Sequence, residues 1–154
     1  MARGGVMKIL ITEDEPIVAD ELEAIVTDLG HQVVGIAGSS RRALTLAQMT
    51  SCDLALVDVH LSDGITGPAV ARHLCEDAHA TVIFTTSNPQ QIPQDFSSAC
   101  GIIIKPYSER SVKSAITFVV DCMQMGSSQR PKPRALELSP AYAARWKVGS
   151  FGKP

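Results

Sequence analysis

Three carboxylates, a hydroxyl and an ammonium group stand at the ends of short apolar runs in this chain. Glu13 and Asp14 follow the first run, Asp58 closes the third, Thr86 stands at the end of the fourth, and Lys105 follows the fifth. Carboxylates that are brought close together repel one another, so that one takes a proton or a hard divalent cation binds between them. Mg2+ fits best, because it accepts few protein oxygens, keeps several waters and binds phosphate oxygen. A carboxylate beside such a cation can attack a phosphoryl group, while an ammonium neutralises charge and a hydroxyl donates a hydrogen bond.

The apolar runs themselves predict the framework that would position these groups. Each run is short and rich in β-branched residues, and helical patterns separate them, which is typical of a parallel sheet covered on both faces. The five runs are Lys8–Thr12, Gln32–Ala37, Leu54–Asp58, Thr81–Thr85 and Gly101–Ile104. In a doubly wound α/β sheet, chemistry lies at the carboxyl ends of the strands, so we expect the polar groups at one edge.

Helical spacing of apolar residues predicts the connections between these strands. Four helices are expected, over residues 16–29, after Ser39 and Ser40, after Gly67-Pro68, and after Ser108. The fourth connection, residues 87–100, contains Pro89 and Pro93, which interrupt a regular helix. We therefore expect a fourth helix that is short or irregular, reduced to one or two loose turns.

The charge of the chain is divided between an acidic body and a basic tail. Residues 126–154 carry six basic residues and one acid, or +5, and the rest carries eight basic residues and 15 acids, or −7. We expect a folded domain at 7–125 and a tail at 126–154 that is flexible or packed on the domain. Within the tail, residues 126–140 indicate a linker and residues 141–148 a short helical segment that carries Trp146.

Several classes of function are disfavoured by composition and spacing. The scattered cysteines and histidines show no metal-ligand spacing, and no apolar run reaches the length of a membrane span. Residues 1–7 do not resemble a secretory signal, so we expect a cytoplasmic protein that does not associate with membranes. The 29 residues from Gly126 are too few for a helix-turn-helix module, so we expect no direct DNA binding. A nucleotide or flavin site is disfavoured because acids follow the first strand where phosphate would lie.

Five motifs, in order and at suitable separations, resemble the receiver domains of bacterial two-component response regulators. They are Ile9-Leu10-Ile11-Thr12-Glu13-Asp14-Glu15-Pro16, Leu54-Ala55-Leu56-Val57-Asp58-Val59-His60-Leu61, Asp63-Gly64, Val82-Ile83-Phe84-Thr85-Thr86 and Ile103-Ile104-Lys105-Pro106-Tyr107. The resemblance covers residues 7–125. It implies a flavodoxin-like, doubly wound parallel sheet of five strands in the order 2-1-3-4-5, with helices on both faces.

The resemblance also assigns roles to the polar groups. It implies that Asp58 accepts a phosphoryl group from a histidine kinase or a histidine phosphotransfer protein. Glu13, Asp14 and Asp58 would bind Mg2+, with the backbone carbonyl of His60 as a further ligand. Thr86 matches the switch hydroxyl of the family, and Lys105 matches the lysine that pairs with the acyl phosphate. The Lys105-Pro106 peptide is expected to be cis, as is typical of the family.

Two features depart from the common receiver pattern. The family usually has an aromatic residue three positions before the lysine, and here that position is Ile102, so the usual coupled aromatic switch is not expected. The proline-broken fourth helix resembles divergent receivers of alphaproteobacteria, including single-domain members of general stress signalling.

We therefore expect a signalling domain, not an enzyme acting on a separate substrate. Our hypothesis is a single-domain regulator, a monomer or weak homodimer, that relays phosphate or acts as a phosphate sink and is read at the surface of the fourth helix, fifth strand and fifth helix. The alternative is a pseudo-receiver scaffold that acts without phosphorylation, which Ile102 keeps open. An aspartate-nucleophile phosphatase is less favoured, since such enzymes need a second Asp where this chain has His60.

Overall fold

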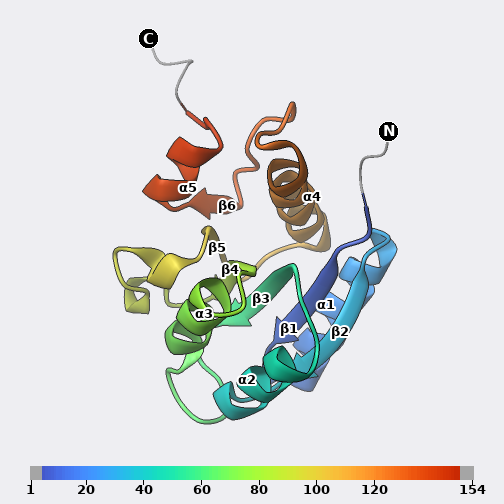
Figure 1. The fold of residues 1–154 in the computed structure, drawn as a ribbon, viewed down its shortest axis with the longest axis vertical. Helices are drawn as coiled ribbons and strands as arrows, with labels where there is room; N and C mark the ends of the chain where they lie inside the picture. Colours follow the sequence, from blue (N-terminus) through green and yellow to red (C-terminus); the bar gives the residue numbers. More distant parts are fainter. Residues whose placement is uncertain (1–4, 150–154) are drawn as a thin grey trace.

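The computed structural model describes residues 5–149 and has a six-stranded sheet at its centre (Figure 1). The strand order is β2-β1-β3-β4-β5-β6. The strands are β1 (Lys8–Thr12), β2 (Gln32–Ala37), β3 (Leu54–Asp58), β4 (Thr81–Thr86), β5 (Gly101–Ile104) and β6 (Leu136–Leu138). The first five strands are parallel, and β6 pairs antiparallel with β5. The predicted α/β flavodoxin-like fold and its strand order are thus confirmed, and the structure adds a sixth strand.

Five α-helices accompany the sheet, two on each face and a short one in the tail. They are α1 (Pro16–Asp28), α2 (Ser40–Met49), α3 (Gly67–Glu76), α4 (Glu109–Met125) and α5 (Pro140–Arg145). Side chains alternate between the two faces of each strand, so Ile9 and Ile11 of β1 pack with α1 and α4, whereas Leu10 packs with α2 and α3. Each face thereby has its own core. None of the helices within 5–149 combines the length and apolar character that crossing a bilayer requires.

Local chemistry sets the ends of the longest helix. Ser108 and Ser111 form a capping box at the start of α4, where each side chain accepts a hydrogen bond from the other residue's backbone N–H. Gly126 ends the helix with a φ of 84°, a left-handed conformation that favours glycine. After a short connection, β5 is therefore followed by a long helix that is capped at both ends and leads into the tail.

The predicted irregular fourth connection is confirmed. Two short 3-10 turns, η1 (Pro89–Gln91) and η2 (Phe96–Ser98), form this connection between β4 and β5. Arg72 of α3 holds η2 in place through Asp95, whose carboxylate lies 2.9 Å from the guanidinium and also accepts a hydrogen bond from the N–H of Ser97.

The tail returns to the sheet in the region for which the sequence indicated a linker. Leu136 of β6 is fully buried, and Trp146 beside α5 is 5% exposed within the core on the α1 and α4 face. Gly101 allows the close approach of β6, because a Cβ atom there would lie 2.7 Å from the carbonyl oxygen of Glu137. The tail strand and β5 therefore fit together backbone against backbone.

Candidate functional site

The acidic groups after β1 lie at the carboxyl edge of the sheet. Glu13 is 2% exposed, and its backbone N–H donates to the carbonyl of Ala37 at 2.8 Å, which extends the pairing of β1 with β2. Asp14 is exposed beside it. One carboxylate oxygen from each of Glu13, Asp14 and Asp58 lies within 4.8 Å of the others. The structure thus brings together the three carboxylates that the sequence suggested for a metal.

Lys105 reaches the same pocket from the end of β5. Its ammonium nitrogen lies 2.8 Å from Asp58 Oδ2 and 3.1 Å from Glu13 Oε1. Its backbone N–H donates to the carbonyl of Thr86 at 2.8 Å, and the Lys105-Pro106 peptide is cis, as expected. One cation therefore bridges two buried carboxylates from strands far apart in sequence.

The other predicted residues lie next to this pocket. The backbone N–H of His60 donates to Asp58 Oδ1 at 3.2 Å, so this residue orients the second carboxylate oxygen. Thr86 is fully buried at the end of β4, and its Oγ1 accepts a hydrogen bond from the N–H of Asn88 at 2.9 Å. A hydroxyl that accepts this bond keeps its own O–H as a donor.

The electrostatics of the pocket favour a cation. Burial, together with the charge of Asp58, raises the pKa of Glu13 to about 7, although Lys105 and the N–H of Glu15 oppose the rise. Burial works against the charge of Lys105, but hydrogen bonds and charges from Asp58 and Glu13 outweigh it and raise the lysine pKa above its ordinary value. With three carboxylates and one ammonium, the fully ionised pocket carries an excess of negative charge. The oxygen donor set and this excess fit Mg2+.

Two neighbours of the pocket escaped the sequence reasoning. Gly67 was interpreted only as the start of a helix, but a Cβ atom there would collide with the carbonyl oxygen of Asp58 and lie 2.6 Å from the Cα of Val59. The hydroxyl of Tyr107 is buried with no hydrogen-bond partner within residues 5–149, and burial raises its pKa to about 12. Tyr107 could have been found from the sequence, because it belongs to the motif Lys105-Pro106-Tyr107. The close backbone contact at Gly67 leaves no signal in the sequence.

Comparisons with known proteins show what this chain is similar to. The family model of the response regulator receiver domain matches residues 9–117. The phyllosphere-induced regulator PhyR of Methylorubrum extorquens is 34% identical over 112 residues, which cover 71% of this chain and 42% of that protein. The positive alginate biosynthesis regulatory protein of Pseudomonas aeruginosa is 33% identical over 114 residues, covering 71% of this chain and 46% of that protein. The chain therefore spans less than half the length of these two relatives.

Solved structures show the same likeness. The receiver domain of PhyR from Erythrobacter litoralis superposes with a TM-score of 0.69 at 27% identity, covering 82% of this chain and 98% of that domain. PhyR from Brucella abortus gives a TM-score of 0.63 at 32% identity, covering 72% of this chain and 46% of that one.

Proposed function

Because the chain belongs to the response regulator receiver family, we propose that it accepts a phosphoryl group on Asp58 from a histidine kinase or a histidine phosphotransfer protein. The observation that carries the proposal is the position of the Lys105 ammonium, 2.8 Å from one oxygen of Asp58, in a pocket that also holds Glu13 and Asp14. If Asp58 were only a helix cap or a turn residue, it would not need an ion pair with Lys105, which lies 47 residues further along the chain.

In this reaction an oxygen of Asp58 attacks the phosphorus atom, and the bond from phosphorus to the donor's imidazole nitrogen breaks with its electron pair left on that nitrogen. Lys105 neutralises negative charge on the transferred group, and Thr86 donates a hydrogen bond to it. Glu13, Asp14 and Asp58, with the backbone carbonyl of His60, would hold Mg2+, which supplies positive charge to the phosphoryl oxygens when bound.

We further propose that the chain acts through protein contacts as a phosphate relay or a phosphate sink. The support for this proposal is that the described residues form a receiver fold on which the tail packs, and such a domain passes its signal on through its surface. The proposal places it in the cytoplasm, where a kinase or phosphotransfer protein can reach Asp58.

Intact mass measurement after incubation with acetyl phosphate and Mg2+ tests the phosphoacceptor. The wild type and the control Asp20→Asn, which removes an exposed carboxylate on α1, should each gain the mass of one phosphoryl group, and Asp58→Asn should gain none. An equal adduct on Asp58→Asn would show that another residue is the acceptor. No adduct on the wild type, with circular dichroism showing a folded chain, would favour the phosphorylation-independent scaffold.

A further inference from the structure

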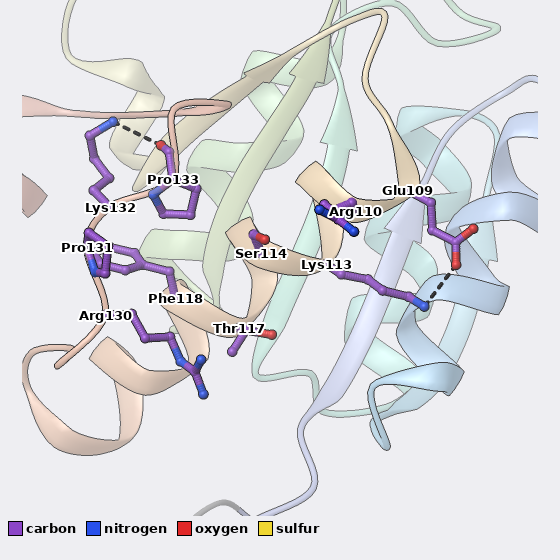
Figure 2. Close-up of a pocket in the computed structure, with 10 residues that line it drawn as sticks. All are labelled: Glu109, Arg110, Lys113, Ser114, Thr117, Phe118, Arg130, Pro131, Lys132 and Pro133. Atoms are coloured by element: carbon purple, nitrogen blue, oxygen red, sulfur yellow. Dashed lines mark hydrogen bonds and ion pairs between the residues drawn. The ribbon is translucent and has the colours of Figure 1, made fainter.

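A groove lies along α4, and its lining includes none of the residues of the phosphoacceptor pocket. It is open, measures about 810 Å³ and runs between α4 and residues 130–133 of the tail. Figure 2 shows Arg110 and Lys113 on the α4 side, Arg130 and Lys132 on the tail side, and Phe118 between them. We call this surface the cationic groove.

The charges along the cationic groove are only partly compensated. Lys132 donates to the backbone carbonyls of Pro133 at 3.1 Å and Leu136 at 2.6 Å, and neutral carbonyls leave its positive charge in place. Arg110 is exposed and forms no ion pair within residues 5–149. Both sides of the groove therefore present a cation that lacks a carboxylate partner.

The other two cations are paired with acids that are exposed or partly exposed. Lys113 lies 2.8 Å from Glu109 and 3.3 Å from Asp28, whose side chains are 64% and 60% exposed. Arg130 lies 3.0 Å from Asp121. Because Glu109 and Asp28 are exposed, an incoming carboxylate can replace them beside Lys113 at small cost, whereas Asp121 is partly buried, also accepts a hydrogen bond from Ser128 and keeps Arg130 paired.

The tail side of the groove limits how a ligand can bind. Pro131 and Pro133 have no backbone N–H, so this wall offers a partner no ladder of donors for strand addition. Recognition must come from the cationic side chains, with apolar contact at the proline rings. A peptide that carries both carboxylates and apolar side chains matches this surface.

A nucleic acid fits the surface less well. The body outside the tail carries a net charge of −7, which repels a long polyanion that extends beyond the groove more strongly than a short acidic peptide confined to it. Phe118 is only 2% exposed, so it offers no platform on which a base could stack. We propose that the cationic groove binds an acidic, partly apolar peptide segment of a protein partner, a contact that goes beyond phosphoryl transfer at Asp58.

Fluorescence anisotropy with a labelled peptide of alternating glutamate and leucine tests the proposal, with glutamine in place of glutamate as the neutral probe. The wild type should bind the acidic peptide, and Arg110→Glu should weaken Kd about tenfold. Arg41→Glu on α2 makes the same change in net charge at an exposed site elsewhere and should bind like the wild type. Amide shifts induced by the peptide should fall on residues 110–118 and 130–133.

A second variant, Lys132→Gln, should also weaken binding, and Trp146 emission checks that its tail stays docked. Equal affinity of Arg110→Glu and Arg41→Glu would overturn the proposal, as would equal binding of the neutral peptide or shifts confined to other elements. Displacement of the peptide by a single-stranded oligonucleotide at matched charge concentration would assign the groove to nucleic acid instead. None of these outcomes depends on phosphorylation of Asp58, so they are independent of the proposed phosphoacceptor role.

Discussion

Gly101 is the position at which the tail can be detached with the smallest chemical change. A Cβ atom added there would lie 2.7 Å from the carbonyl oxygen of Glu137 and 3.0 Å from Cδ1 of Leu136. The Leu136 side chain can rotate, but the Glu137 oxygen is backbone within the β5–β6 pair and cannot move without loss of the pairing. We therefore predict that Gly101→Ala displaces β6 from β5.

The expected cost follows from what β6 contributes. Leu136 is fully buried, which stabilises by about 1.5–3 kcal/mol for a leucine. The N–H of Ser139 donates to the carbonyl of Cys100 at 2.8 Å, and such a bond contributes about 1 kcal/mol net. Loss of these contacts predicts a fall of about 2.5–4 kcal/mol in the free energy of unfolding.

Trp146 is the only tryptophan in the chain, so its fluorescence reports on the tail alone. It is 5% exposed when docked, and displacement should shift its emission to the red and increase quenching by acrylamide. The matched control is Gly35→Ala in β2, where a Cβ atom would meet only the flexible side chain of Leu46, with Cδ1 nearest at 2.8 Å. If Gly101→Ala keeps the Trp146 emission of the wild type and unfolds in urea like Gly35→Ala, then the pairing of β6 with β5 does not require glycine at position 101.

Three further predictions test other parts of the structure. Gly67→Ala places a methyl group against the carbonyl of Asp58, so it should cost about 1–3 kcal/mol in urea unfolding and slow labelling by acetyl phosphate; an unchanged labelling rate would contradict this. Burial raises the pKa of Cys75 to about 11 from 9.0, so at pH 8 iodoacetamide should alkylate it about a hundredfold more slowly than an ordinary thiol, as peptide mass mapping can measure. Burial lowers the pKa of His31, whose Nδ1 accepts a hydrogen bond from the N–H of Met7 at 3.1 Å. Because the folded pKa lies below 6.5, the unfolded chain binds more protons, and the contribution of His31 to stability is present above pH 6.5 and is lost as the pH falls through the folded pKa. His31→Gln should therefore flatten the pH dependence of urea unfolding in that range, and parallel curves for the two proteins would count against it.

The sheet was predictable because its inner strands β1, β3, β4 and β5 are buried on both faces over nearly their whole length. Four of the five parallel strands have the predicted bounds, and β4 extends one residue further, to Thr86. A strand covered on both faces must be apolar at nearly every position, so its ends coincide with the ends of the apolar run. The fourth connection was predictable for the opposite reason, since Pro89 and Pro93 exclude a regular helix whatever surrounds them.

The polar pocket was predictable only in outline. Parallel strands end at one edge, which is why Asp58 and Lys105 could be expected together, although 47 residues separate them. The supporting contacts depend on tertiary position and left no local signal. Asp63, for example, accepts hydrogen bonds from the hydroxyl of Ser40 at 2.6 Å and from Thr66 at 2.7 Å, and so ties the loop after β3 to the start of α2.

The tail was the part that sequence patterns described least well, and its position changes the meaning of Ile102. Residues 136–138 make a strand of three residues after a proline-rich stretch, too short for alternation to separate it from a loop. The strand exists because β5 offers an edge and Gly101 allows close approach. In register, Ile102 pairs with Phe84 on one side and Glu137 on the other, so it lies inside the sheet and is 3% exposed. Its side chain packs in the core on the α2 and α3 face, while β6 covers the backbone edge of its strand. The surface next to β5 is therefore built from β6, residues 130–133 and α4, which is why a search for contacts of this protein should begin at the cationic groove.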